Sequence, residues 1–173
     1  MIRVFNVDEE GRFGGPARRI SLVASELQNL GIDMTIVIPK LDNTYFKNYI
    51  IERKIKHLVL DITRLSLESK ILFRFFVRFL LEVFLLVRTL ARHKPDIVHV
   101  NGASQFKVAV AAKLARRRVV WHLNNTYLKR PVKFVFVLLS RFCVDGVIYA
   151  GSRAGEFYRV EQRFNGIPCA NIE

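Results

Sequence analysis

Short apolar runs alternate with segments of helical periodicity along this chain, and this alternation is what most constrains its fold. The apolar runs predict strands at residues 2–7, 34–38, 57–62, 97–100, 119–123 and 146–150. The segments between them predict helices over residues 16–30, 67–93, 105–115 and 131–142, with a further helix within 151–160. Residues 40–55 are polar and fit neither pattern. Strands that alternate with helices indicate an α/β domain with a mostly parallel sheet.

The charge of the chain narrows the classes of partner. Lys and Arg number 28 against 15 Asp and Glu, which gives a net charge of +13. Such a charge favours an anionic partner: nucleic acid, a phosphorylated ligand or acidic lipid. The basic run 116–118 would suit nucleic acid, but the sequence holds no recognised nucleic-acid motif, so we expect no nucleic-acid partner.

The cysteines and the apolar segments indicate a cytoplasmic protein. Neither Cys143 nor Cys169 belongs to a CxxC pair or lies near a histidine at metal-ligand spacing, so we expect no metal site. The N-terminus lacks the apolar run of a signal peptide. The longest apolar region, 71–87, is interrupted by charged residues, so we expect no membrane-spanning helix.

A glycine-rich loop, residues 11–15, follows the first predicted strand. In open parallel sheets, ligands bind outside the carboxyl ends of the strands. Glycines such as Gly14 and Gly15 let backbone N–H groups approach an anion, and the start of the next helix adds a positive dipole end. The loop matches neither GxGxxG nor a Walker motif. A tight turn with Arg18 and Arg19 on the surface explains it equally well.

Polar residues also follow three later strands. Asparagine can both donate and accept hydrogen bonds, as recognition of sugar hydroxyls requires. Each group also has a structural explanation: a hydrogen-bonding histidine, an Asn-rich turn and a helix cap. The candidates for ligand binding are His99, Asn101 and Gly102 at the end of the fourth strand, His122, Asn124 and Asn125 at the end of the fifth, and Ser152 after the sixth.

Four segments, in order, resemble the N-terminal domain of family-4-type glycosyltransferases of the GT-B fold. Gly14-Gly15-Pro16 with Arg18, followed by residues 30–37, is similar to the opening of that family. Residues 94–102 read KPDIVHVNG, close to the KPDIVHVHG of the family. Residues 119–126 read VVWHLNNT, which resembles VVWHLHDT, and residues 147–152 read VIYAGS, which resembles VIAVS. The resemblance covers residues 1–160. It implies a Rossmann-like, mostly parallel sheet flanked by helices, half of a GT-B fold.

The resemblance implies the acceptor-binding half of a retaining glycosyltransferase that uses a nucleotide-sugar and needs neither metal nor cofactor. Gly14 and Gly15 would approach the donor diphosphate, and Arg18 would neutralise it or an anionic acceptor. Asn124 stands where the family has a histidine near the reacting sugar, and asparagine cannot carry a proton at neutral pH. The donor half of the family, with two glutamates eight positions apart, has no counterpart in this sequence.

The missing donor half shapes the partners that we expect. Residues 161–173 would be a connecting segment toward an absent donor-binding domain, and without that domain the chain should be inactive. The implied partners are a nucleotide-sugar, a glycan or lipid-linked acceptor, and a donor-domain polypeptide encoded separately. The alternative function is a non-catalytic binding module that retained the fold, at an anionic membrane surface.

The predicted helix over 67–93 has two interpretations. Its charged residues fall within an arc of about 160° at 100° per residue, and the rest of the helix is almost entirely apolar. This fits a helix that packs on the sheet and turns one charged stripe to water. It also fits peripheral binding to the inner face of a membrane. The basic residues of that contact would be Arg74, Arg78, Lys129, Arg130 and Lys133.

Overall fold

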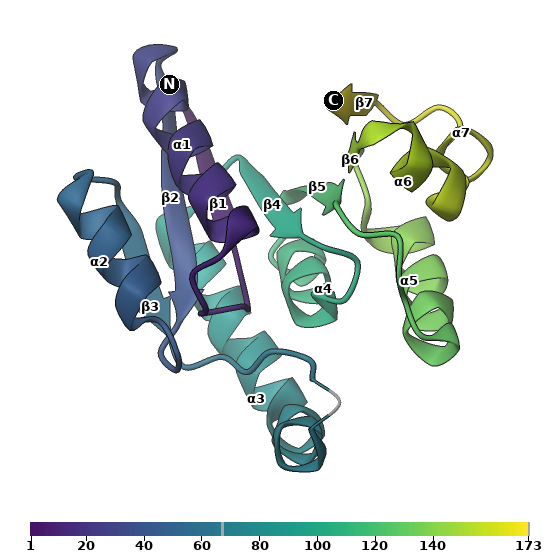
Figure 1. Cartoon of the computed structure of the whole chain (residues 1–173), viewed down its shortest axis with the longest axis horizontal. Helices are drawn as coiled ribbons and strands as arrows, with labels where there is room; N and C mark the ends of the chain where they lie inside the picture. Colours follow the sequence, from purple (N-terminus) through teal and green to yellow (C-terminus); the bar gives the residue numbers. More distant parts are fainter. Residues whose placement is uncertain (67, 173) are drawn as a thin grey trace.

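The fold is a parallel sheet between two layers of helices, seen in a computed structural model that describes residues 1–66 and 68–172 (Figure 1). The strands are β1 (Ile2–Val7), β2 (Ile32–Pro39), β3 (His57–Leu60), β4 (Ile97–Asn101), β5 (Arg118–Leu123), β6 (Gly146–Ala150) and β7 (Cys169–Ile172). The helices are α1 (Gly15–Asn29), α2 (Thr44–Glu52), α3 (Ser69–His93), α4 (Phe106–Leu114), α5 (Arg130–Cys143), α6 (Gly151–Tyr158) and α7 (Val160–Arg163).

The strand order of the sheet is β3-β2-β1-β4-β5-β6-β7, and every neighbouring pair is parallel. The predicted Rossmann-like α/β fold is therefore confirmed. The order reverses between β1 and β4, which pair from Val4↔Ile97 to Val7↔Val100. In such sheets, ligands bind outside the carboxyl ends of the strands at this reversal. A ligand is therefore expected beside the loops after β1, β4 and β5.

Two cores cover the two faces of the sheet. Helices α1 and α2 pack on one face, over Met34, Ile36 and Ile38 of β2. Helices α3, α4 and α5 pack on the other face, where Trp121 meets the ring of Phe136 edge-on at 5.0 Å between centroids. Because both faces are covered, the central strands read as apolar runs without clear alternation.

Helix α2 lies within the segment that the sequence left unassigned. Phe46 and Ile50 are the residues that α2 buries, four positions apart on one side of the helix. So narrow an apolar stripe gives a weak periodic signal. The third predicted strand ends at Leu60 rather than at residue 62. The predicted start of the long helix, Leu67, lies outside the described residues, and α3 begins at Ser69.

Residues 169–172, within the segment expected to be a connection, form the last strand of the sheet. Strand β7 pairs in parallel with β6, from Val147↔Cys169 to Ala150↔Ile172. The outer edge of β6 offers backbone N–H and C=O groups that need partners, and β7 supplies them. Four residues of the predicted connecting segment are therefore a strand of this sheet. That the segment leads toward a donor-binding domain stays a prediction, and Glu173 lies outside the described residues.

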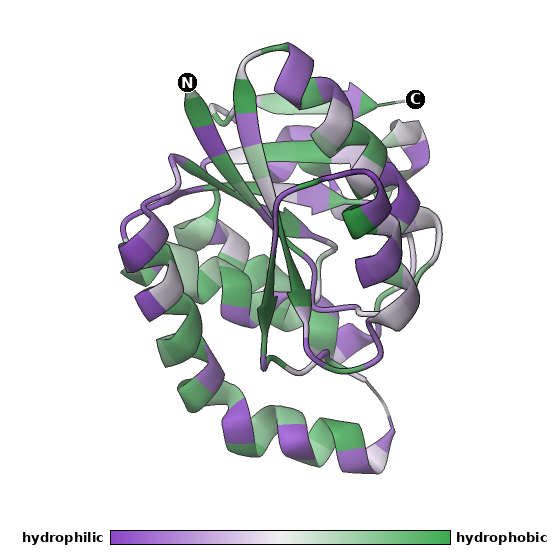
Figure 2. Ribbon diagram, turned by 90° about the vertical axis from the view of Figure 1, so that its left-hand side faces the viewer, coloured by the Kyte–Doolittle hydropathy of each residue, from purple (hydrophilic) through white to green (hydrophobic). Residues whose placement is uncertain are grey.

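Helix α3 turns a broad apolar side to solvent as well as most of its charged residues. The expectation of one charged stripe facing water is wrong for the middle of the helix, because Glu82 is fully buried and pairs with Lys107 of α4 at 2.6 Å. In Figure 2, the turns of α3 next to the grey residue extend below the rest of the molecule and are largely hydrophobic. The large apolar residues exposed on α3 are Phe73, Phe76, Val77, Leu80, Leu81 and Phe84.

Candidate functional site

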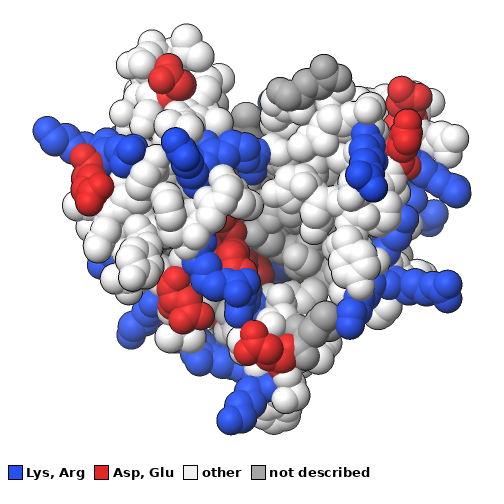
Figure 3. Space-filling view, viewed as in Figure 1, with Lys and Arg blue, Asp and Glu red and all other residues white. Residues whose placement is uncertain are grey.

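Two adjoining hollows lie where β1, β4, β5 and the start of α1 meet. The first, of about 550 Å³, is lined by Gly15, Pro16, Arg19, His122, Asn124, Asn125, Ala150 and Ile172. The second, of about 340 Å³, shares Pro16, Asn124 and Asn125 with the first. Figure 3 shows this face, hollowed between the α1 side and the α6 side. The residues that the second hollow adds include Asp8, Glu10, Gly14, Asn101, Gly102 and Gln105.

A row of polar side chains crosses the sheet beneath the first hollow. Arg19 Nη1 lies 2.7 Å from each ring nitrogen of His122. His122 Nδ1 lies 3.3 Å from His99 Nε2, and the two rings stack with 5° between their planes. His99 Nδ1 lies 3.1 Å from Asn6 Nδ2, and Asn101 donates to Asn6 Oδ1. Strand register produces this row, because Asn6 pairs with His99 and Asn101 pairs with His122.

The two histidines of this row are neutral at pH 7. Burial, reinforced by the charge of Arg19, lowers the pKa of His99 to about 4. Burial, then Arg19 and then His99, lowers the pKa of His122 to about 3. Arg19 keeps its charge, because an arginine guanidinium is not deprotonated in proteins. The site therefore combines one cationic group with neutral hydrogen-bonding groups, a combination suited to a ligand with an anionic part and hydroxyls.

Asp8 is a functional candidate that sequence reasoning missed. It directly follows β1 and lines the second hollow. Its Oδ1 accepts hydrogen bonds from the backbone N of Glu10 at 3.0 Å and from Gln105 Nε2 at 3.1 Å. Burial is the main cause that raises the pKa of Asp8 to about 7. Its place at the end of a strand next to the sheet reversal was the signal that could have found it.

Glu9 is buried beside Asp8, and its burial predicts a pH dependence of the stability of the fold. Neither carboxylate oxygen of Glu9 has a hydrogen-bond partner among the described residues, and Lys107 Nζ lies 3.8 Å from Oε2. Burial raises the pKa of Glu9 to about 8. Carboxyls with raised pKa values stabilise the fold at low pH and lose this contribution as pH rises through the folded-state pKa. The histidines act oppositely, since their contribution is lost as pH falls below their usual value of 6.5.

Between pH 6.5 and about 8, the buried carboxyls should therefore dominate, and the free energy of unfolding should fall as pH rises. Glu9→Gln removes one of the titrating groups, so between pH 6.5 and 8 its free energy of unfolding should fall by about 1–2 kcal/mol less than that of wild type. Urea unfolding followed by the fluorescence of the single tryptophan, Trp121, measures this. Glu26→Gln, at an exposed position of α1, is the control. Parallel curves for wild type and Glu9→Gln would contradict the prediction.

The structure gathers most of the predicted site residues at these hollows. Gly14 caps α1 and Gly15 is its first residue. Gly102 has φ +83° and its N donates to His122 O at 2.8 Å, which ties the loops after β4 and β5 together. Tyr158 Oη donates to Asn125 Oδ1 at 2.7 Å. The predicted residues that line a hollow are Gly14, Gly15, Asn101, Gly102, His122, Asn124 and Asn125, and His99 contacts His122 from below.

Arg19, rather than Arg18, is the arginine at the hollows. Arg18 is exposed and lines neither of them. Arg19 is four residues after Gly15 and therefore lies on the same side of α1, toward His122. Its Nη2 also donates to Asn101 Oδ1 at 3.4 Å. The spacing of about one helical turn between Gly15 and Arg19 was the sequence signal that could have identified Arg19.

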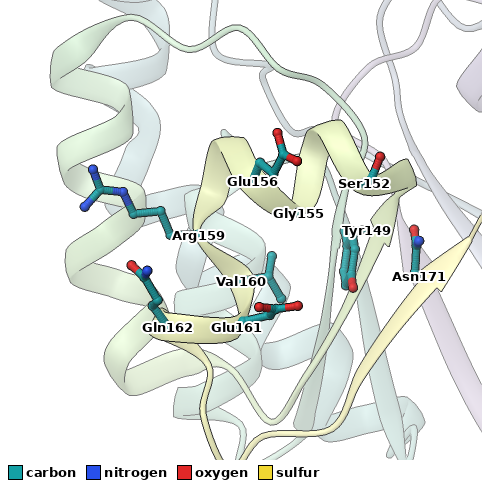
Figure 4. A pocket seen from close by; sticks show the side chains of 9 residues that line it. All are labelled: Tyr149, Ser152, Gly155, Glu156, Arg159, Val160, Glu161, Gln162 and Asn171. Atoms are coloured by element: carbon teal, nitrogen blue, oxygen red, sulfur yellow. The ribbon is translucent and has the colours of Figure 1, made fainter.

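Ser152 lies apart from the other predicted residues. It lines a third hollow, of about 540 Å³, between α6, α7 and the end of the sheet (Figure 4). Gly155 faces the ring of Tyr149 there, and a Cβ at Gly155 would lie 2.9 Å from Tyr149 Cε2. The other residues around this hollow include Glu156, Arg159, Glu161, Gln162 and Asn171.

The basic residues proposed for a membrane contact differ in whether their side chains already bind other groups of the protein. Arg78 Nη2 lies 2.7 Å from Asp61 Oδ2, and Arg74 Nη2 lies 3.6 Å from Asp61 Oδ1. Lys133 Nζ donates to Phe157 O at 3.2 Å. Lys129 and Arg130 are exposed at the start of α5. Arg74 and Arg78 are therefore engaged by carboxylates of the protein itself.

Residues 1–66 and 68–172 contain no group of three or more His, Cys, Asp or Glu side chains placed to hold a metal ion. None of their helices is long and apolar enough to cross a bilayer.

Comparisons with known proteins match both the sequence and the fold. The sequence profile of Glycosyltransferase Family 4 matches residues 13–159. A comparison with curated protein sequences found no match. The solved structure of Anabaena HepE in complex with UDP and glucose aligns with a TM-score of 0.73 and 19% identity over 99% of this chain and 44% of that one. Acinetobacter baumannii MurG aligns with a TM-score of 0.63 and 20% identity, over 87% and 41%.

An epimerase shares the fold as well. UDP-GlcNAc 2-epimerase from Neisseria meningitidis, bound to UDP-GlcNAc, aligns with a TM-score of 0.66 and 17% identity over 93% of this chain and 44% of that one. The chain thus spans less than half the length of these structures. At such identities the likeness establishes the fold, and the family rests on the sequence profile.

Proposed function

This chain belongs to glycosyltransferase family 4, and on that basis we propose that it is the acceptor-binding half of a retaining glycosyltransferase with a nucleotide-sugar donor. The observation that carries the proposal is the position of Arg19 with His122 and Asn101, beside the start of α1 and at the reversal of the strand order. The first N–H groups of a helix have no intrahelical acceptor, and the helix start is electropositive. Together with Arg19, that end of α1 suits a diphosphate.

The remaining groups suit a sugar. His122 is neutral, and asparagine side chains both donate and accept, so these side chains can bind hydroxyls without competing for the phosphate charge. In this proposal, Gly14 and Gly15 approach the donor diphosphate, and Asn124 orients the reacting sugar. Asn124 would not move a proton, because its amide does not titrate near neutral pH. The UDP and glucose of the HepE complex support a nucleotide-sugar as the ligand.

The donor half of the cleft is the second part of the proposal. Because this chain spans about 44% of the HepE chain, we propose that a donor-binding domain, on the same or a separate polypeptide, supplies the rest. These 173 residues by themselves would then bind ligands without transferring sugar. The acceptor that we propose is a glycan or a lipid-linked sugar, and a cytoplasmic location stays a prediction.

The test is transfer by the purified 173 residues with and without a donor domain. The tagged chain is recovered from its own cells, and co-purifying polypeptides are identified by mass spectrometry. We expect no product from the chain alone with any nucleotide-sugar, and turnover once a donor-binding domain is added. Robust turnover by the chain alone would overturn the proposal. Glycan binding without transfer in any combination would instead assign the chain as a binding module.

The variant Gly15→Val tests whether turnover, measured with the donor-binding domain added, depends on this site. A Cβ at Gly15 would meet nothing within 4 Å, and the residue does not have positive φ, so the variant should fold. The added side chain should obstruct approach of the diphosphate and lower turnover while the unfolding temperature stays unchanged. Unchanged turnover would mean that the loop is a turn and not a phosphate site.

A further inference from the structure

A broad apolar surface on α3 has no partner among the described residues. It comprises Phe73, Phe76, Val77, Leu80, Leu81 and Phe84, which are 61–80% exposed, and we call it the α3 face. At 100° per residue, these side chains span an arc of about 140°. The opposite side of the helix is the buried one, with Phe75, Val83, Leu86 and Leu90 among its residues. Contiguous apolar surfaces of this kind mark sites of contact with protein or membrane.

Basic residues lie at both ends of the α3 face along the helix. On the same helical wheel, Lys70 and Arg88 fall inside the apolar arc, and Arg92 falls at its edge. All three are exposed, and no ion pair is formed by them within residues 1–66 and 68–172. The acidic residue within α3, Glu82, is fully buried. The apolar surface is therefore flanked at both ends by cations that anionic headgroups could neutralise.

We propose that the α3 face docks on an anionic lipid bilayer, with α3 lying in the plane of the interface. The phenylalanine and leucine side chains would enter the boundary between headgroups and acyl chains, and Lys70, Arg88 and Arg92 would contact lipid phosphates. The helix lies on the membrane and does not cross it, in agreement with the absence of a spanning helix in the described residues. This inference does not depend on the proposed glycosyl transfer.

Charge favours lipid over a second copy of the chain. A two-fold dimer through the α3 face would bring two identical basic borders together, on chains of net charge +13 each. The donor-binding domain proposed above would complete the cleft at the two hollows, and none of the six residues of the α3 face lines either of them.

The proposed contact also differs from the one that the sequence suggested. Arg74 and Arg78 are held by Asp61, and Arg78 Nε also lies 3.2 Å from Glu82 Oε1. Replacing these two arginines would disturb the fold around Glu82 as well as any lipid contact. The structure instead points to exposed apolar residues and to the free cations at their border as the positions to change.

The apolar contribution is tested with Leu80→Glu combined with Phe84→Glu. These side chains are 80% and 63% exposed, so the double variant should fold, as thermal unfolding can verify. Sedimentation with vesicles of phosphatidylcholine mixed with phosphatidylglycerol measures the partition coefficient, which should fall at least about tenfold. The matched control is Leu30→Glu combined with Ile51→Glu, which are 74% and 50% exposed and lie at the end of α1 and on α2, across the sheet. It makes the same change in charge and should lower binding less than about threefold.

The electrostatic contribution is tested with Arg88→Gln combined with Arg92→Gln. Loss of two surface cations should weaken binding to anionic vesicles about tenfold or more, and less so in high salt. Arg116→Gln combined with Arg118→Gln, also exposed, is the charge-matched control and should bind nearly as wild type. Absence of vesicle binding by wild type, or equal losses in test and control variants, would overturn the proposal. A dimer in analytical ultracentrifugation that Leu80→Glu with Phe84→Glu abolishes, without vesicle binding, would assign the face to a second copy.

Discussion

Replacing Lys107 with methionine should lower the free energy of unfolding by about 3–5 kcal/mol. Lys107 and Glu82 are fully buried, and Lys107 Nζ lies 2.6 Å from Glu82 Oε2. Lys107 Nζ also donates to Thr63 O and lies 3.8 Å from Glu9 Oε2. Methionine has a similar length but no charge, so the variant would leave the Glu82 carboxylate in the interior without its closest cation. Urea unfolding followed by the fluorescence of Trp121 measures the loss.

An exposed lysine on the same helix provides the matched control. Lys113 Nζ lies 3.1 Å from Asp145 Oδ1, with the two side chains 44% and 36% exposed. Solvent screens such a pair, so Lys113→Met should cost less than about 1 kcal/mol. Adding Glu82→Met to Lys107→Met should recover part of the loss, because the double variant buries no unpaired charge. A cost for Lys107→Met no greater than that for Lys113→Met would show that the buried pair is not a stabilising contact.

The Lys107 network matters for the site as well as for stability. Through Thr63, Glu82 and Glu9, it connects the segment after β3, helix α3 and the loop after β1. That loop carries Asp8 into the second hollow. A buried lysine of α4 therefore helps to hold the first site loop, although it lines neither hollow at the carboxyl edge.

Replacing Arg19 with methionine should weaken binding of UDP about 10- to 100-fold, the range expected when hydrogen bonds to a charged group are lost. Arg18→Met should change the affinity less than about twofold, because Arg18 is exposed on another side of α1. NMR titration of the backbone amides with UDP measures the affinity of each variant. The opposite ranking of the two variants would restore Arg18 as the phosphate ligand.

The pKa values of His99 and His122 provide a second, independent measurement on the Arg19→Met variant. The charge of Arg19 is one of the causes that hold the pKa of His99 near 4 and that of His122 near 3. Both pKa values should therefore rise in Arg19→Met and stay unchanged in Arg18→Met, as followed by NMR of the imidazole protons. If neither histidine responds to Arg19→Met, burial alone sets these pKa values.

The order of the elements could be predicted because each gives a local signal. Strands β1, β4 and β5 are buried on both faces, so they read as short apolar runs, and helices α1 and α5 carry proline in their first turn. Helix α2 escaped prediction because it buries a narrow stripe. Strand β7 escaped because all four of its residues are exposed, so it carries no apolar pattern, and its partner β6 defines it.

The sequence by itself determined the alternation of strand and helix, and with it the parallel sheet and the edge at which the loops with Gly15, His99 and His122 would gather. The tertiary structure alone decided which side of α3 is buried. Periodicity places residues around a helix but does not say which direction is inward when apolar residues surround most of it. That direction depends on Lys107, which is 25 residues from Glu82 and pairs with it inside the fold. A contact between distant residues leaves no local pattern in the sequence. Only the structure therefore shows which apolar side of α3 is exposed.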